Sequence, residues 1–374
     1  MMEFAEPWMQ YMFIVLLLTV LVQLLNYYMS YRRLAFYKAS PEPEGVQGVS
    51  IVICARNEKV NLEKNLPAIL DQVYPELEVI VVNDCSWDSS GELLEEFARN
   101  YPRLKVVTLV EQEKYKHGKK FALTIGIKAA KYDLLLLTDA DCMPQSRNWC
   151  SSFQHHFSDG TEIVLGYGAY KKESGLLNKL IRFDTMIIAM QYLSSAIAGN
   201  AYMGVGRNMA YRKSLFFRNK GFASHNHLLS GDDDLFVNQN ANKTNVKIEI
   251  NQDAFTLSEP RKTFSGWFDQ KVRHMSTSSH YKFAHKLMLF TASSSTLFFY
   301  LLSAALIIAG YDWRIILSLY GLVLLLKLPV LWKVSHKLNE KDLFWLFPLL
   351  EPVLYIIQPF FYITNLFTKQ KAWK

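Results

Sequence analysis

The chain has 374 residues, of which 50% are hydrophobic, and a formal net charge of +7. This length holds one large domain or two ordinary ones. Its basic residues concentrate near apolar segments rather than along one motif, so we expect an anionic membrane and phosphorylated substrates as partners and no nucleic acid. The four cysteines show no Cys-x-x-Cys spacing, and we expect reduced thiols.

An apolar segment lies near the start of the chain. Only Gln23 and Asn26 interrupt residues 11–28, and a segment of this length can cross a bilayer. No small-residue cleavage site follows it, so residues 1–40 are predicted to form a membrane anchor with its linker, which continues through residues 41–48.

Flanking charges predict how this anchor is oriented. Glu3 and Glu6 precede it, whereas Arg32, Arg33 and Lys38 follow it. Because basic residues favour the cytoplasmic side, the globular domain is expected to face the cytoplasm. The expected localisation is the cell membrane, crossed several times.

Residues 45 to about 280 have an ordinary globular composition, and strand and helix patterns alternate in the domain predicted at 41–260. This alternation predicts an α/β domain with a doubly wound, mostly parallel sheet, in which ligands bind beyond the carboxyl ends of the strands. The absence of a Gly-x-Gly-x-x-Gly or Walker motif argues against dinucleotide and P-loop sites. The expected strands are 49–54, 77–82, 104–110 and the four leucines of 134–137, and the expected helices are 60–72, 89–100 and 118–131.

Polar clusters follow three of these strands, at 55–58, 83–88 and 138–141, and their convergence predicts one nucleotide-like site. Asp139 and Asp141 are two residues apart in an extended segment, so their carboxylates point the same way. Such an oxygen pair suits Mg²⁺ or Mn²⁺ carrying a substrate diphosphate.

Seven short motifs lie in a distinctive order between residue 49 and about residue 285. They are Val-Ser-Ile-Val-Ile-Cys-Ala-Arg-Asn-Glu58, Val-Val-Asn-Asp-Cys-Ser-Trp-Asp88, Gly-Lys-Lys-Phe-Ala-Leu123, Leu-Leu-Thr-Asp-Ala-Asp141, Gly206-Arg-Asn-Met-Ala-Tyr-Arg-Lys213, Gly231-Asp-Asp-Asp-Leu235 and Gln270-Lys-Val-Arg-His274. As a set they resemble membrane-bound glycosyltransferase family 2, which has the Rossmann-like GT-A fold. The resemblance implies inverting transfer of a sugar from a nucleotide diphosphate sugar to an acceptor hydroxyl.

The resemblance also implies residue roles. The positions that match nucleotide-binding and metal-binding positions of the family are Ala55, Asn57, Glu58, Asp84, Lys119, Asp139 and Asp141. Asp84 matches the acid that holds the base or ribose, whereas Asn83 replaces a second acid. Lys119 matches the Gly-Lys element, with a solvated lysine at a helix start as the alternative.

Two segments are expected near the acceptor. The mainly apolar stretch 176–199 predicts a helix that is too short and too charged to span a membrane, and we expect a core or membrane-facing helix. Residues 204–209 form a glycine-rich turn where the family admits the acceptor, although a plain turn is the alternative.

Three consecutive acids, Asp232, Asp233 and Asp234, precede a predicted helix at 235–240. Capping of the positive helix end explains at least one of them. Inverting transfer also needs a carboxylate to accept the proton of the attacking hydroxyl. Aligned with the Glu-Asp pair of the family, Asp233 is the predicted base and Asp232 a substrate ligand, but the register leaves Asp232 and Asp234 open as alternatives for the base.

Residues 261–286 are predicted to form an amphipathic, basic, tryptophan-bearing segment in the membrane interface. Its Gln270, Arg273 and His274 resemble the Gln-x-x-Arg-Trp element of the family, in which arginine meets the diphosphate and the aromatic lines the acceptor path. His274 in place of tryptophan favours a single transfer over processive synthesis.

Residues 287–374 are predicted to form a C-terminal membrane region with apolar runs at 287–309, 313–332 and 343–367. If the last run crosses once, the basic tail lies outside, against the positive-inside rule. Because this run contains prolines and Glu351, a broken or re-entrant helix is the alternative. The tail lysines are Lys369, Lys371 and Lys374.

The resulting hypothesis is metal-dependent sugar transfer to a lipid-linked or glycan acceptor at the cytoplasmic face of a membrane. The alternatives are a processive polysaccharide synthase and a non-catalytic protein that only binds nucleotide sugars. The sequence leaves the sugar, the base and the acceptor open.

Overall fold

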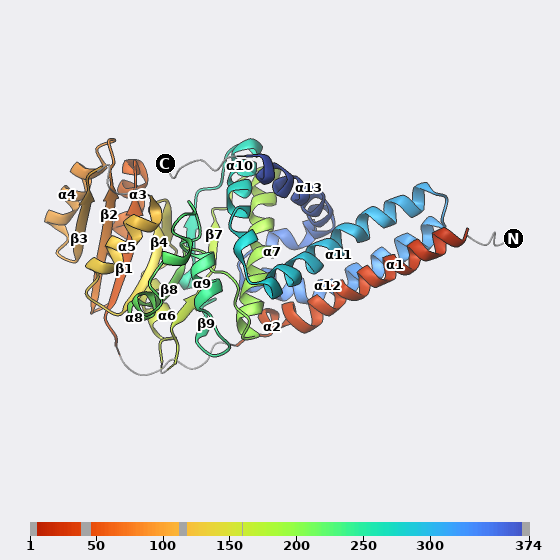
Figure 1. Ribbon diagram of the computed structural model, residues 1–374, viewed down its shortest axis with the longest axis horizontal. Coiled ribbons are helices and arrows are strands. Elements are labelled where there is room, and N and C mark those ends of the chain that lie inside the picture. Colours follow the sequence, from red (N-terminus) through yellow and green to blue (C-terminus); the bar gives the residue numbers. More distant parts are fainter. Residues whose placement is uncertain (1–5, 39–45, 112–117, 159, 369–374) are drawn as a thin grey trace.

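The computed structural model describes residues 6–38, 46–111, 118–158 and 160–368. Figure 1 shows an α/β domain at one end and long helices that extend away from it, with the first turn of α1 (Pro7–Leu25) at the far tip. Most of the expected linker 41–48 lies outside the described residues. Glu3 and the tail lysines Lys369, Lys371 and Lys374 lie outside them too.

The domain is built on a seven-stranded sheet of order β3-β2-β1-β4-β8-β6-β9. Only β8 runs antiparallel to its neighbours β4 and β6, so the predicted mostly parallel sheet is confirmed. A second sheet has the order β5-β10-β7. The bounds are β1 Val49–Ala55, β2 Leu77–Asp84, β3 Leu104–Leu109, β4 Leu134–Asp139, β5 Cys142–Pro144, β6 Ile163–Leu165, β7 Gly168–Tyr170, β8 Met209–Arg212, β9 Val246–Ile248 and β10 Thr256–Ser258.

Helices cover both faces of the large sheet, so neighbouring side chains of one strand enter different cores. Val52 lies in the core that contains α5, whereas Ile51 lies in the core that contains α3 and α4. Gly126 lets α5 approach closely, because a Cβ there would stand 2.7 Å from Val52. The helices are α3 Lys59–Leu70, α4 Ser90–Asn100, α5 Lys119–Ala129, α6 Trp149–Gln154, α7 Leu176–Ile197, α8 Lys213–Arg218, α9 Asp234–Asn240 and α10 Phe264–Met275.

Among the described residues, four helices are long and apolar enough to cross a membrane. The first is α1 (Pro7–Leu25), which continues through a π-helical turn, η1 (Asn26–Tyr31), into α2 (Arg32–Ala35). The others are α11 (Phe283–Ile308), α12 (Trp313–Lys337) and α13 (Phe347–Phe367), which follows the 3₁₀ turn η5 (Lys341–Leu346). Figure 1 shows α1, α11 and α12 side by side in the extension.

A buried polar cluster joins all four of these helices. Lys327 of α12 donates to Gln23 of α1 at 2.7 Å and to Glu351 of α13 at 3.0 Å. The Tyr300 hydroxyl of α11 donates to Glu351 at 2.7 Å. Both buried charges of this cluster, Lys327 and Glu351, therefore have partners, as ionisable groups at membrane depth require.

The last apolar helix, α13, takes a different course from the other three. Figure 1 shows it at the base of the extension, beside α10 and the domain. Trp267 and Phe268 of α10 lie 5.4 and 5.0 Å from the ring of Phe361 in α13. Helix α13 thus packs against part of the apolar face of α10.

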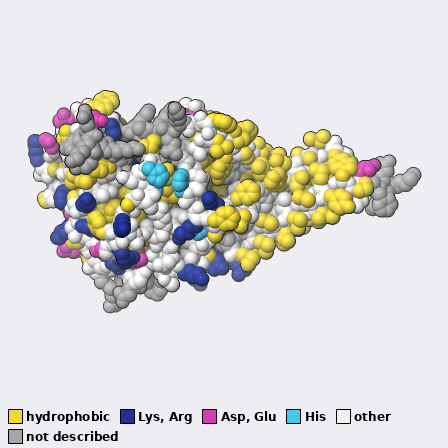
Figure 2. All heavy atoms as spheres, in the orientation of Figure 1, with side chains coloured by type: hydrophobic (Ala, Val, Ile, Leu, Met, Phe, Trp, Pro, Cys, Tyr) yellow, Lys and Arg dark blue, Asp and Glu magenta, His cyan; other side chains and the backbone are white. Residues whose placement is uncertain are grey.

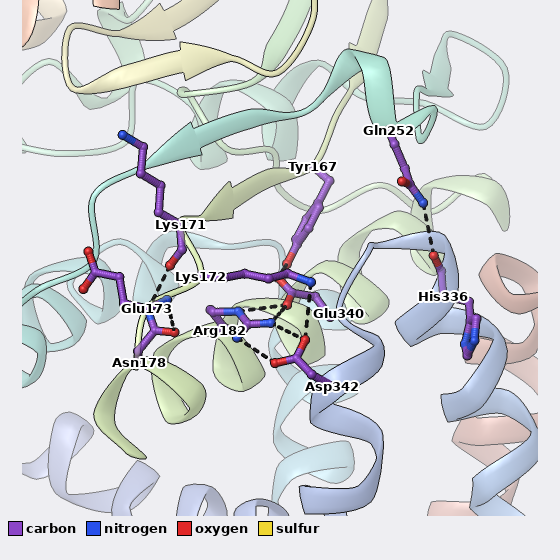
Figure 3. Close-up of polar contacts among 10 residues, drawn as sticks. All are labelled: Tyr167, Lys171, Lys172, Glu173, Asn178, Arg182, Gln252, His336, Glu340 and Asp342. Atoms are coloured by element: carbon purple, nitrogen blue, oxygen red, sulfur yellow. Dashed lines mark hydrogen bonds and ion pairs between the residues drawn. The ribbon is translucent and has the colours of Figure 1, made fainter. Parts of the chain in front are cut away.

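The helix predicted at 176–199 is α7, a core helix between the sheet and the extension, and most of its side chains are buried. From α7, Arg182 binds Glu340 at 3.0 Å and Asp342 at 2.8 Å (Figure 3). The Tyr167 hydroxyl also donates to Glu340, at 3.2 Å. Because both acids lie between α12 and α13, these contacts fix the membrane-length helices to the domain.

Candidate active site

The ends of three strands meet at one edge of the large sheet. In the register, Cys54 of β1 lies beside Asp139 of β4, and Ala55 lies beside Asn83 of β2. The polar clusters predicted at 55–58, 83–88 and 138–141 are therefore neighbours, because parallel strands deliver their carboxyl ends to the same side.

The loops after β1 and β2 are joined by hydrogen bonds. Asn57 has a left-handed backbone, with φ +56°, and its side chain accepts from the backbone of Trp87 at 3.0 Å. The backbone of Glu58 donates to Ser90 at 3.2 Å. Asp84 is fully buried at the end of β2. Asn57 thus shapes the loop that the family resemblance assigns to the nucleotide.

A lysine lies between two acids of the site. The Lys119 ammonium is 2.9 Å from Asp139 and 2.9 Å from Asp232. Burial alone would raise the pKa of Asp232, but Lys119 holds it below its ordinary value. The same three side chains line a small cavity of about 10 Å³ next to Gly206. Lys119 is therefore part of the acidic site rather than a solvated lysine.

The three consecutive acids have different surroundings. Asp234 is buried and accepts hydrogen bonds from Thr277 and, at 2.7 Å, from Tyr281. Asp233 is half-buried and accepts from the backbone of Gly206 and of Asp234, both at 2.7 Å. Since Lys119 neutralises Asp232, Asp233 is the acid of the three without a cationic or hydroxyl partner among the described residues.

Asp233 also has the protonation behaviour of a base that works near neutral pH. Burial and the charges of Asp232 and Asp234 raise its pKa to about 7. A catalytic base is most effective when its pKa lies near the working pH. Together with the contacts of the three acids, this pKa favours Asp233 over Asp232 and Asp234 as the base.

The predicted metal pair lies at the exit of β4. Ligand atoms of Asp139, Asp141 and Cys142 lie within 4.8 Å of one another, and Asp141 is exposed. Burial raises the pKa of the Cys142 thiol well above its ordinary value, so this group stays protonated and leaves the two carboxylates as the ionic ligands. Burial and the charges of Asp141 and Asp139 raise the pKa of Glu58 above its ordinary value. This oxygen set fits Mg²⁺ or Mn²⁺.

The α10 element is less tightly linked to the acids. Gln270 donates to the Tyr170 hydroxyl at 3.2 Å. Arg273 and His274 are exposed, and within the described ranges no hydrogen bond or ion pair joins them to the acidic cluster. Their predicted roles toward substrate stay predictions.

Four residues of the site were not singled out from the sequence. Thr277 and Tyr281 hold Asp234, while the Arg207 guanidinium lies 4.4 Å from the ring centroid of Tyr170 and donates to Gly168 at 2.6 Å. Arg207 belongs to the motif at 206–213, which was the available signal. The contacts of Thr277 and Tyr281 depend on a packing that no local pattern reveals.

Comparison with known proteins identifies the family. The model of glycosyl transferase family 21 matches residues 11–374. The chain belongs to glycosyl transferase family 21. This family is of the same GT-A type as the family 2 enzymes that the motifs resemble, so the prediction of a glycosyltransferase is confirmed.

Relatives of this family 21 glycosyltransferase match parts of it. A poly-beta-1,6-N-acetyl-D-glucosamine synthase of Staphylococcus epidermidis is 35% identical over 111 residues, which cover 30% of this chain and 25% of the synthase. The probable glycosyltransferase YdaM of Bacillus subtilis is 26% identical over 232 residues, covering 60% of this chain and 54% of that protein. The chain thus matches between a quarter and about half of the length of these relatives.

One solved structure supports the fold over nearly the whole family 21 chain. The mannosyltransferase PcManGT from Pyrobaculum calidifontis, in complex with GDP-Man and Mn²⁺, aligns with a TM-score of 0.59. The alignment covers 93% of this chain and 99% of that one, at 18% identity. At this identity the likeness confirms the GT-A fold alone.

Proposed function

We propose that the chain transfers a sugar from a nucleotide diphosphate sugar to an acceptor hydroxyl, with inversion at the anomeric carbon. The observation that carries this proposal is the convergence of Lys119, Asp139, Asp232 and Asp233 at the carboxyl edge of the sheet. The complex of the PcManGT neighbour with GDP-Man and Mn²⁺ supports the same donor class.

The donor diphosphate binds where the loops after β1 and β2 face the acids of β4. Asp139 and Asp141 would hold Mg²⁺ or Mn²⁺, which supplies positive charge against the negative charge of the diphosphate leaving group. Lys119 moves from its two carboxylate partners toward the phosphates and adds a further cation. Arg273 offers a planar guanidinium from α10 to the same group.

Asp233 acts on the acceptor. Its carboxylate takes the proton of the acceptor hydroxyl while the hydroxyl oxygen forms a bond to the anomeric carbon from the face opposite the diphosphate. The bond between that carbon and the phosphate oxygen breaks at the same time, and the nucleotide diphosphate leaves. No covalent intermediate with the protein is needed.

The acceptor is a lipid-linked sugar or a glycan presented at the cytoplasmic face of a membrane. The membrane-length helices bring the domain to a bilayer, and Arg182 with its two acids holds it close to them. Arg32 and Arg33 at the domain end of α1 support a cytoplasmic domain by the positive-inside rule.

A processive polysaccharide synthase is the second candidate. The 35% identity to poly-beta-1,6-N-acetyl-D-glucosamine synthase over 111 residues favours it. His274 at the position of the family tryptophan favours a single transfer. Mass analysis of the product separates the two, because a single transfer adds one sugar and a synthase yields a ladder.

The proposal is tested with the purified full chain in detergent and a panel of nucleotide sugars with Mg²⁺ or Mn²⁺. We expect release of nucleoside diphosphate from one donor class, dependent on the divalent ion. No release from any donor, with either ion and with membrane lipid extract as acceptor, would refute it.

A further inference from the structure

A group of basic side chains surrounds the place where α1 meets the domain, and we call Arg32, Arg33 and Lys333 the basic collar. Arg32 and Arg33 begin α2, and the Lys333 ammonium of α12 lies 4.7 Å from the ring centroid of Phe36. Figure 2 shows Lys and Arg side chains along the lower edge of the molecule, where the apolar extension begins.

A hollow opens beside the collar. It has a volume of about 760 Å³, and Tyr28, Met29, Arg32, Arg33 and Phe36 line it. Tyr28 and Met29 lie in the π-helical turn, and they are 38% and 66% exposed. One wall is therefore apolar and aromatic, and the other carries two guanidinium groups.

The charges of the collar are not neutralised by the protein. Across the residues that the structure describes, no ion pair joins Arg32, Arg33 or Lys333 to a carboxylate, and all three side chains are exposed. The Arg33 side chain is oriented by its hydrogen bond to the Met29 carbonyl at 3.0 Å. An anion that binds here would thus meet positive charge without displacing a protein partner.

We propose that the basic collar binds the phosphate headgroup of an anionic phospholipid, with the acyl chains against Tyr28, Met29 and Phe36. The position supports a lipid rather than a soluble anion, because the collar ends a helix of membrane length and shares the hollow with exposed apolar side chains. Guanidinium groups bind phosphate oxygens in pairs, and clustered basic residues at this depth attract anionic lipids.

The bound lipid would hold the domain in a fixed position at the membrane. The segment that carries the two arginines packs against α7 and α12, and Lys337 of α12 donates to the Tyr37 carbonyl at 2.8 Å. The lipid would thus bind where the extension and the core of the domain meet. This binding does not depend on the sugar-transfer function, and it is measured without a sugar nucleotide.

The test uses the purified full chain in a neutral detergent and dioctanoyl phosphatidylglycerol as the probe, with binding counted by native mass spectrometry. Dioctanoyl phosphatidylcholine is the neutral comparison. We expect phosphatidylglycerol to bind at least tenfold more tightly than phosphatidylcholine. The double variant Arg32→Gln/Arg33→Gln should weaken phosphatidylglycerol about 30-fold, which follows from about 1 kcal/mol for each basic residue near a membrane surface.

Arg314→Gln is the matched control, because Arg314 is another exposed arginine at the end of a membrane-length helix, in α12 beside the α11–α12 turn. Arg314→Gln should change the affinity for phosphatidylglycerol less than twofold. In a separate competition with the parent chain, inorganic phosphate should not displace the bound phosphatidylglycerol. All three substituted side chains are exposed, so we expect the variants to fold. The same gel-filtration elution volume and the same unfolding temperature as the parent, both measured without lipid, will verify this. Equal losses in Arg314→Gln and the double variant, equal binding of both lipids, or displacement by inorganic phosphate would each overturn the proposal.

Discussion

The raised pKa of the half-buried Asp233 leads to a quantitative prediction for the pH dependence of sugar transfer. Its pKa is raised to about 7 by burial and by two neighbouring carboxylates. A base must be ionised to accept a proton, so kcat/KM should rise with pH through this value. About a tenth of the molecules are active at pH 6 and about nine tenths at pH 8, which gives an acidic limb with a midpoint near 7 in the free enzyme.

Asp233→Asn removes the base while keeping the size of the side chain. We expect kcat to fall about 100-fold or more, the usual contribution of a positioned base. A raised pKa means that folding disfavours the ionised carboxylate, so the neutral variant should be at least as resistant to thermal unfolding at pH 8 as the parent. Release of nucleoside diphosphate measures the rate, and light scattering with tryptophan fluorescence measures unfolding.

Asp253→Asn is the control, since Asp253 is an exposed acid of the same domain in a short 3₁₀ turn. It should keep the parental rate and the parental pH profile. A flat profile between pH 5.5 and 8.5, or an Asp233→Asn enzyme with more than a tenth of the parental kcat, would refute Asp233 as the base.

Four further changes probe the surroundings of that base. Asp139→Asn, or chelation of divalent ions by EDTA, should abolish nucleoside diphosphate release, and in the chelated parent added Mn²⁺ should restore it. Lys119→Met should raise the KM for the donor about tenfold, because one cation facing the diphosphate is lost; an unchanged KM contradicts this role. Tyr281→Phe removes one hydrogen bond to Asp234, whose charge acts on the pKa of Asp233. It should lower kcat several-fold, change the donor KM little and shift the acidic limb of the pH profile. A purely structural role of Tyr281 would leave that limb in place. Arg182→Met leaves buried Glu340 without its cationic partner and should reduce the free energy of unfolding by about 3 kcal/mol, measured by chemical denaturation in detergent.

Much of the domain could be predicted because its strands follow simple rules. The four leucines before Asp139 form a strand covered on both faces, and such a strand is a continuous apolar run. The alternation of strands and helices then determines the parallel order and brings three polar strand ends to one edge. The elements predicted between residues 49 and 139 accordingly match the observed ones to within a few residues.

The roles of the three consecutive acids could not be read in the same way. Asp232, Asp233 and Asp234 are chemically identical, and their differences arise from Lys119 in a distant helix and from Tyr281 after α10. The same limit applies to the apolar face of α10. The amphipathic segment predicted at 261–286 contains α10, but only the tertiary structure shows that α13, about ninety residues later, packs against its aromatic side chains.

These long-range contacts also link the membrane-length helices to the candidate base. Glu340, between α12 and α13, binds the Tyr167 hydroxyl, and the Tyr167 carbonyl accepts from Asn208 at 2.9 Å. The Asn208 backbone donates to the Val205 carbonyl at 2.9 Å and closes a turn that contains Gly206. The Gly206 backbone donates to Asp233 at 2.7 Å. These contacts form a continuous connection from the two helices to the hydrogen bond that orients the candidate base. Under the proposal that the acceptor arrives from a membrane, this connection gives a physical reason for building the site against the helices rather than on a free domain.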